Sequence, residues 1–151
     1  MSQSLSILYT HATFGTKGRN PWINKEIAND LHAYMASIFK ALDSPAVIIN
    51  SMPDHIHVLF RMSKTVTIAE VMEEIKKSSS KWMKNQPMGT PFFYWQRGYG
   101  AFSVSGSHLA AVTRYIARQK EHHKKLTYRE EVERLIKKYN VEEYNPEYYW
   151  D

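Results

Sequence analysis

Two histidines stand two residues apart in the strand-like run Pro53–Phe60, whose sequence is PDHIHVLF. Successive side chains of a β-strand point to opposite faces, so His55 and His57 project from the same side. Two neutral imidazoles fixed side by side can bind a metal ion when a third ligand lies nearby. Such a pair is more often an exposed or core feature than a metal site, so the metal hypothesis depends on the rest of the chain.

A second chemically suggestive group is formed by Tyr115 and Gln119, which are four residues apart and therefore neighbours on one helical face. A glutamine carbonyl is a neutral oxygen ligand, and with two imidazoles it leaves a divalent ion most of its positive charge. Such a site suits Mg²⁺ or Mn²⁺ acting as a Lewis acid on a phosphodiester. Tyr115 is then a candidate nucleophile for the same phosphorus. The alternatives are a packing tyrosine and a solvated glutamine.

Basic residues surround this tyrosine and glutamine, which favours a substrate that carries phosphate. They are Arg114, Arg118, Lys120, Lys124 and Lys125. His122 and His123 also lie nearby, and we expect them to contact solvent or phosphate rather than a metal ion.

The composition limits the class of protein. The chain has 151 residues, 43% of them hydrophobic, which suffices for one domain with a core and argues against disorder. It has no cysteine, hence no disulfide and no thiolate zinc site. No apolar run approaches the ~20 residues that span a bilayer, and the first residues lack the features of a signal peptide, so we expect a cytoplasmic protein. The net charge of +5 favours a polyanionic partner such as nucleic acid, although basic solvated surfaces are common.

Hydrophobic periodicity predicts the elements that must position the candidate residues. Strands are expected at Leu5–Thr13, at Ala46–Asn50 and over the run that carries the histidines, and the turn 51–54 joins the last two as a hairpin. A basic loop at 15–21 follows the first strand. A helix capped by Asn24 comes next, with an apolar stripe that extends to Leu42.

A second helix is expected to begin at the capping-box spacing Thr67–Glu70. One of its faces carries four lysines, and a solvated face and a phosphate-contacting face both agree with that pattern. Residues 92–105 predict a strand that is broken near Gly98 and Gly100. A third helix, capped by Ser107, is expected over His108–His123, and a fourth over Thr127–Tyr139.

The order strand, helix, strand, strand, helix, strand predicts an α+β fold of the ferredoxin-like or RRM-like split βαβ type. Its antiparallel sheet carries two helices on one face, and the helix of Tyr115 lies toward the other. The histidines would look out from that second face, which this layout leaves open. We expect a single domain over 1–151, with a core at about 1–125 and a C-terminal helix and tail at about 126–151.

The run Pro53–Leu59 resembles the HUH motif (histidine, hydrophobic residue, histidine) of single-tyrosine insertion-sequence transposases of the transposase A type. Tyr115–Gln119 resembles the Tyr-x-x-x-Gln helix of that family, and the segments 16–19, 95–99 and 148–150 are similar to it as well. The resemblance implies an HUH endonuclease that cleaves and rejoins single-stranded DNA. A metal held by His55, His57 and Gln119 would polarise the phosphate, and attack by Tyr115 would give a 5′-phosphotyrosine link.

The resemblance also implies partners. Such transposases bind single-stranded DNA, often through a hairpin near the element end, and work as homodimers, commonly with active sites completed in trans. The residues that we assign to DNA binding are Lys17, Arg19, Lys76, Lys77, Lys81, Arg97, Arg114, Arg118 and Lys120.

Two other functions compete with transposition. A non-catalytic, domesticated single-stranded nucleic-acid-binding protein would have the same fold, but it has no chemical need for the two histidines, the tyrosine and the glutamine. A magnesium-dependent nuclease without covalent chemistry is the other alternative.

Overall fold

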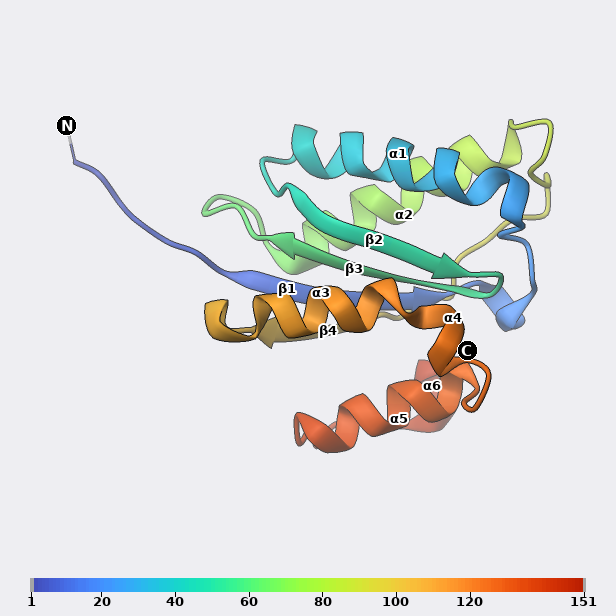
Figure 1. Ribbon diagram of the computed structural model, residues 1–151. Coiled ribbons are helices and arrows are strands. Elements are labelled where there is room, and N and C mark those ends of the chain that lie inside the picture. The colour runs from blue at the N-terminus through green and yellow to red at the C-terminus, as the bar shows by residue number, and fades with distance from the viewer. Residues whose placement is uncertain (1, 151) are drawn as a thin grey trace.

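A four-stranded antiparallel sheet forms the centre of the computed structural model, which describes residues 2–150 (Figure 1). The strands are β1 (Tyr9–Gly15), β2 (Ala46–Met52), β3 (His55–Arg61) and β4 (Gly100–Val104). The helices are α1 (Lys25–Ala41), α2 (Ile68–Lys84), α3 (Leu109–Ala117), α4 (Gln119–His122), α5 (Tyr128–Lys138) and α6 (Pro146–Tyr149), with 3₁₀ turns η1 (Lys17–Arg19) and η2 (Gly106–His108). The strand order β2-β3-β1-β4, with every neighbouring pair antiparallel, confirms the predicted ferredoxin-like fold. No helix within the described residues is long and apolar enough to cross a membrane.

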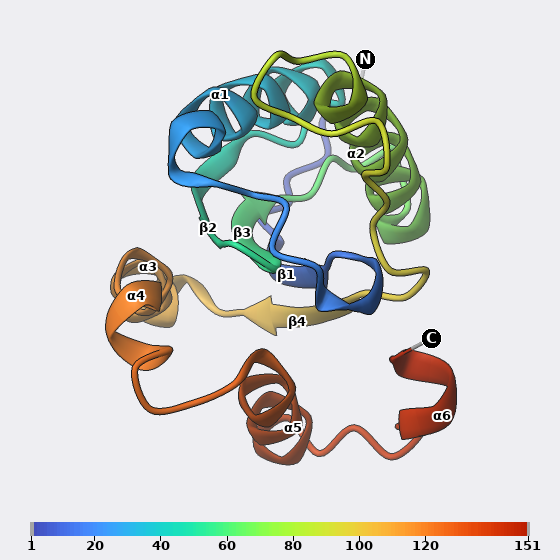
Figure 2. The ribbon, with the colours of Figure 1, turned by 90° about the vertical axis from the view of Figure 1, so that its right-hand side faces the viewer.

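Helices α1 and α2 pack on one face of the sheet and enclose the main core (Figure 2). Each begins at its predicted cap: the Asn24 side chain accepts a hydrogen bond from the Ile27 amide at 3.0 Å, and Thr67 accepts one from the Glu70 amide at 3.1 Å. The buried residues that meet in this core include Phe14, Leu31, Met35, Phe39, Ile56, Val58, Phe60, Val71 and Ile75. Because the even-numbered residues of β3 face this core, the odd-numbered histidines must face the other side.

The second face of the sheet is covered. Figure 2 shows α3, α4 and α5 on the side of the sheet opposite α1 and α2. Ile116 packs against Leu59 and Val104, and Tyr139 stacks on Phe102 with ring centroids 4.9 Å apart. Leu59 follows the histidines on the same side of β3, and burying it requires a helix on that face. The expectation of an open face is therefore wrong.

The first strand is shorter than predicted and lies later in the chain. It begins at Tyr9, and the side chains of Leu5, Ile7 and Leu8 are 85%, 66% and 60% exposed. Tyr9 pairs with Arg61 and with Val104, which are the last residues of β3 and β4. β3 and β4 both end at this point, and one further backbone hydrogen bond, from the Met62 amide to the Leu8 carbonyl at 2.8 Å, is all that continues the pairing toward the N-terminus within the described residues.

The predicted strand over residues 92–105 is reduced to β4, which begins at Gly100, close to the predicted break. The third predicted helix is divided. The turn η2 precedes α3, and Arg118 interrupts the helix with φ −100° and ψ 25° before α4 begins. The amide of Asn50 on β2 donates to the carbonyls of Ile116 at 2.8 Å and Ala117 at 3.4 Å, which satisfies the end of α3. The fourth predicted helix is confirmed as α5, with a capping box between Thr127 and Glu130.

Candidate active site

His55 and His57 lie side by side on β3, and neither has any exposed surface. Their rings are 5.3 Å apart between centroids. Gly15 pairs with His55 on the adjacent strand, and a side chain there would meet Tyr128 of α5 at 3.0 Å. The absence of that side chain lets the Tyr128 ring stack on His55 with centroids 4.0 Å apart and an interplanar angle of 12°.

Tyr115 of α3 and Gln119 of α4 extend toward the two histidines from the helices that cover this face of the sheet (Figure 2). The Gln119 side chain is fully buried, and its Oε1 lies 3.2 Å from His55 Nε2. The hydroxyl of Tyr115 donates to Glu131 Oε2, and Gln119 Nε2 donates to the same oxygen at 2.9 Å. The structure thus brings the four predicted site residues together within one chain, although the helix is broken between Tyr115 and Gln119.

Glu131 of α5 is a site residue that sequence reasoning missed. Its carboxylate is 1% exposed, and its Oε1 lies 3.0 Å from His57 Nε2, 2.9 Å from His123 Nε2 and 3.6 Å from His55 Nε2. A signal was present in the sequence: Glu131 adjoins Val132 in the buried stripe that begins at Tyr128, where an unpaired charge would be costly. His55, His57 and Glu131 each offer a ligand atom, and these atoms lie within 4.8 Å of one another.

A hydrogen-bonding partner on the outer side of each ring fixes which nitrogen each histidine presents to this centre. Asp54 Oδ1 lies 2.7 Å from His55 Nδ1, and the Leu126 carbonyl lies 2.8 Å from His123 Nδ1. His11 Nε2 lies 2.8 Å from His57 Nδ1. In all three rings Nδ1 is engaged outward, so Nε2 faces the centre, as in metal sites where a second group orients the ligand histidine.

The donor atoms fit a divalent cation. When neutral His55 donates its Nδ1 hydrogen to Asp54, its Nε2 carries only a lone pair, which faces the Gln119 carbonyl oxygen. In its neutral form His123 would likewise turn a lone pair toward Gln119 Oε1 at 3.1 Å and Glu131 Oε1 at 2.9 Å, whereas its protonated form donates to Glu131. Acceptors that face acceptors in a buried site require a proton or a metal ion between them. The set of imidazole, carboxylate and amide oxygen is suitable for a metal.

Burial and hydrogen bonding set the charges of the site. Burial alone would raise the pKa of Glu131, but hydrogen bonds from His123 and His57 hold that pKa well below its usual range, so the carboxylate is ionised. Burial, together with the charge of Glu131, raises the pKa of Tyr115, whose hydroxyl keeps its proton in this arrangement. Burial lowers the pKa of His57. Burial opposes protonation of His123 too, yet its hydrogen bond to Glu131 raises its pKa above the ordinary value.

The residues predicted to bind DNA lie on different surfaces. Arg114, Arg118 and Lys120 are exposed on or beside α3 and α4, next to the tyrosine. Lys77 and Lys81 are exposed on α2, across the sheet from the histidines (Figure 2). Lys17 and Arg19 lie in η1, and Arg97 is exposed before β4.

Lys76 is engaged inside the protein. Its ammonium donates to the carbonyls of Gln96, Arg97 and Gly98 at 2.8, 2.9 and 2.7 Å. Burial lowers the pKa of Lys76 to about 8. A contact between Lys76 and DNA would compete with these three bonds.

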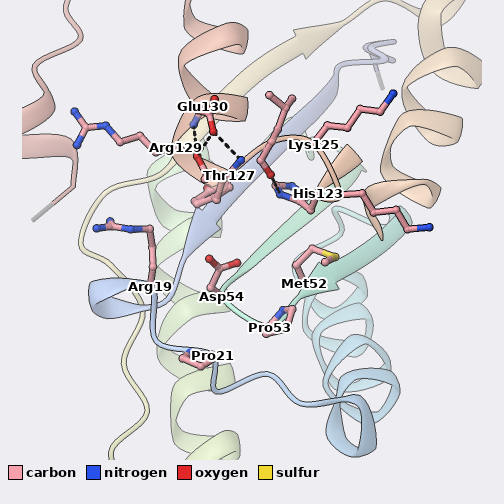
Figure 3. Close-up of a pocket in the computed structure, with 13 residues that line it drawn as sticks. Arg19, Pro21, Met52, Pro53, Asp54, His123, Lys125, Thr127, Arg129 and Glu130 are labelled. Carbon is pink, nitrogen blue, oxygen red and sulfur yellow. Dashed lines mark hydrogen bonds between the residues drawn. The ribbon is translucent and has the colours of Figure 1, made fainter. Parts of the chain in front are cut away.

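A cavity of about 800 Å³ opens beside the candidate centre, between η1 and the loop from α4 to α5 (Figure 3). Asp54 and His123, which both contact His55, line it. Its cationic lining residues are Arg19, Lys124, Lys125 and Arg129. Its wall contains two carboxylates, Asp54 and Glu130, against these four cations, so the cavity carries net positive charge.

Comparison with known proteins agrees with this geometry. Residues 4–119 match the family described as "Transposase IS200 like". A structure of a candidate transposase from Deinococcus radiodurans R1 is 23% identical, with a TM-score of 0.60 over 79% of this chain and 98% of that one. The structure of a REP-associated tyrosine transposase bound to a REP hairpin is 13% identical, with a TM-score of 0.59 over 82% of this chain and 74% of that one. No curated protein matches the chain. The family match spans most of the sequence, and the chain belongs to the IS200-like transposase family.

Proposed function

We propose that the protein is a transposase that cleaves and rejoins single-stranded DNA at insertion-sequence ends through a 5′-phosphotyrosine intermediate. The observation that carries the proposal is the convergence of Tyr115, Gln119 and the two strand histidines on one buried carboxylate. Packing alone does not explain a phenol, an amide and imidazoles around a single charge, whereas phosphoryl transfer needs a nucleophile beside a cation site.

His55, His57 and Gln119 would hold Mg²⁺ or Mn²⁺, with Glu131 beside them. When bound, the ion supplies Lewis-acid polarisation of the scissile phosphate. Tyr115 Oη forms a bond to phosphorus, the bond from phosphorus to the 3′ oxygen breaks, and the leaving 3′ oxygen takes up a proton from water to become a free 3′-hydroxyl. Glu131 Oε2 already accepts the hydrogen bond of that phenol, so it is the atom placed to receive the proton. A later attack by a 3′-hydroxyl on the phosphotyrosine releases Tyr115 and reseals a strand without any nucleotide cofactor.

We propose that the strand reaches this centre through the basic cavity of Figure 3, whose wall includes His123 and Asp54. Phosphates would be neutralised by Arg19, Lys125 and Arg129. DNA hairpins at the element ends are the proposed partners, supported by the hairpin complex of the REP-associated relative. A homodimer with sites completed in trans is part of the same proposal, although in a single chain Tyr115 already contacts the centre.

The decisive experiment incubates the protein with labelled single-stranded element-end DNA and Mn²⁺ and separates products under denaturing conditions. We expect a covalent protein–DNA adduct that disappears in Tyr115→Phe, while DNA binding persists. Tyr34→Phe is the matched control, because Tyr34 stacks on Trp82 on the other side of the sheet. An adduct that survives in Tyr115→Phe would eliminate the nucleophile assignment.

One observation favours the alternative of a non-catalytic single-stranded nucleic-acid-binding protein. His55, His57 and Gln119 have no exposed surface, and Glu131 of α5 fills the space beside them. On that reading the wild-type protein binds hairpin DNA but gives no adduct with any divalent ion, which distinguishes the two functions in the same assay.

A further inference from the structure

We propose that His123 is a third imidazole ligand of the metal centre and that the site consequently prefers a transition-metal dication to Mg²⁺. The inference rests on the metal site of the proposed function and extends its ligand set beyond His55, His57 and Gln119. The sequence indicated a solvent or phosphate contact for His123, which lies four residues after Gln119.

His123 faces the same two oxygen atoms as His55. Its Nε2 lies 3.1 Å from Gln119 Oε1 and 2.9 Å from Glu131 Oε1, and the corresponding distances for His55 are 3.2 and 3.6 Å. The rings of His55 and His123 are 4.5 Å apart between centroids. The His123 side chain is 8% exposed, so most of it is buried in the site while one side lines the cavity.

The orientation of His123 is fixed as that of a ligand would be. The Leu126 carbonyl accepts the Nδ1 hydrogen, which is the role that Asp54 has for His55. The backbone amide of His123 also donates to the Gln119 carbonyl at 3.0 Å, so one helical turn sets the two side chains in register. A ring held at both points keeps its Nε2 lone pair directed at the centre.

The separations match those of atoms that share one ion. With metal–ligand bonds of about 2.0–2.2 Å, neighbouring ligand atoms lie roughly 2.8–3.1 Å apart in octahedral geometry and roughly 3.3–3.6 Å apart in tetrahedral geometry. Five distances join the imidazole nitrogens of His55, His57 and His123 to Gln119 Oε1 or Glu131 Oε1. They run from 2.9 to 3.6 Å. All three nitrogens thus lie within 3.6 Å of Glu131 Oε1, and those of His55 and His123 also lie within 3.2 Å of Gln119 Oε1.

This ligand set determines the class of metal. Mg²⁺ prefers oxygen ligands and retains bound water, whereas imidazole suits later first-row transition metals such as Co²⁺ and Zn²⁺ and binds Mn²⁺ less strongly than these. A site with two imidazoles and oxygen ligands can still serve Mg²⁺. A third imidazole shifts the preference away from it.

The neighbouring His122 provides a matched control. It is one residue away, but its ring stacks on Tyr115 with centroids 4.5 Å apart. Within the described residues, the His122 side chain makes no hydrogen bond to Gln119 or Glu131, in contrast to that of His123.

The test measures metal binding to the full-length, metal-free protein without DNA, by calorimetry with Co²⁺, Mn²⁺ and Mg²⁺. We expect Co²⁺ and Mn²⁺ to bind at least about tenfold tighter than Mg²⁺. His123→Ala should weaken Co²⁺ binding by about 10–100-fold and change the visible Co²⁺ spectrum, while His122→Ala should do neither. Unchanged Co²⁺ affinity and spectrum in His123→Ala would overturn the proposal.

A measurement on the wild-type protein covers the case in which His123→Ala fails to fold. Bound Co²⁺ shifts the ring N–H signals of coordinated histidines far outside the normal proton NMR range, and we expect three such signals. Two would contradict the third ligand. These measurements are independent of the adduct assay. If the adduct is lost in Tyr115→Phe but only two histidines bind the metal, this inference fails and the proposed function stands. If the protein binds no metal at all, the metal site fails in this inference and in the proposed function alike.

Discussion

Asp54 and His11 determine which nitrogen atoms the two strand histidines offer to the centre. Asp54 accepts from His55 Nδ1 at 2.7 Å, and hydrogen bonding holds the pKa of Asp54 below its usual value against the opposing effect of burial. His11 is buried, and its pKa is lowered to about 3, first by burial and then by neighbouring His57, so it acts as a neutral partner. Orientation by such partners commonly accounts for part of the affinity of a metal site.

Asp54→Ala should therefore weaken Mn²⁺ binding by about 10–100-fold, because His55 loses the group that fixes its ring. Asp54→Asn, which retains an oxygen acceptor without the charge, should lie between the wild type and Asp54→Ala. Calorimetric titration of the metal-free protein measures both. Asp43→Asn is the control, since Asp43 is in the turn after α1, where its positive φ of 51° suits asparagine as well. Equal affinity in all variants would remove Asp54 from the metal centre.

The position of a site residue could be predicted when neighbours in the sequence indicated it, whereas a contact set only by the tertiary fold could not. His55 and His57 follow from strand alternation, and Tyr115 and Gln119 from helical spacing, so four side chains could be named. Glu131 lies on the buried stripe of α5 and His123 lies four residues after Gln119, so each had a local signal. Their contact with each other and with the strand histidines could not be predicted, because α5 and the preceding loop fold back over the sheet and join residues as far as 74 positions apart.

At the level of elements, the break between α3 and α4 positions the nucleophile and the amide ligand. The helix stripe predicted one continuous helix, since no glycine or proline interrupts residues 109–122. The interruption arises from a tertiary contact instead: Asn50, on the edge strand β2, donates to the last carbonyls of α3. Tertiary pairing also sets the first strand, which begins at Tyr9 because its partner strands β3 and β4 end opposite that residue, and not at Leu5, where its own hydrophobic pattern begins.

Replacing Asn50 by Ala should lower the free energy of unfolding by about 1 kcal/mol, the usual value of one such hydrogen bond. It should also slow adduct formation, because the end of α3 no longer holds Tyr115 against Glu131. Urea denaturation and the rate of adduct formation give the two readings. Asn85→Ala removes a comparable amide bond, to the Lys81 carbonyl at 2.8 Å, from the exposed end of α2 and should leave the adduct rate unchanged. If both variants slow the adduct equally, the effect is not specific to α3.

The packing of α1 against β2 predicts that the stability of the fold depends on pH. His32 Nε2 lies 2.8 Å from Ser51 Oγ, and burial lowers the pKa of His32. The unfolded chain takes up a proton near pH 6.5 while the folded chain resists it, so stability is complete above that pH and falls as the pH drops below it. This group contributes a slope of at most about 1.4 kcal/mol per pH unit. His32→Gln should flatten the decline between pH 7.5 and pH 5 in thermal melts, and an unchanged profile would refute the assignment.

Across the whole molecule, the sheet separates two basic surfaces. One is the cavity bounded by Arg19, Lys125 and Arg129, beside the candidate centre; the other is the exposed face of α2 with Lys77 and Lys81. Trp150 lies between Arg19 and Arg129, whose guanidinium carbons are 5.3 and 5.7 Å from its ring centroid. An aromatic ring between cations is the arrangement that single-stranded nucleic acid uses for stacking and charge neutralisation. The charge count alone could not distinguish the two surfaces.

Neutralising each surface in turn decides which one binds the strand. If the cavity is the path, Arg19→Gln with Lys125→Gln should weaken binding of single-stranded DNA and reduce the slope of log affinity against log salt by about 1.4, roughly 0.7 for each lost phosphate contact. Lys77→Gln with Lys81→Gln removes the same charge from α2 and should change neither quantity, since a strand on that face is separated from Tyr115 by the sheet. Fluorescence anisotropy over a salt series measures both double variants. Loss of slope in the α2 variant, with the cavity variant unaffected, would place the DNA on the face away from the tyrosine and rule out the cavity as its route to the centre.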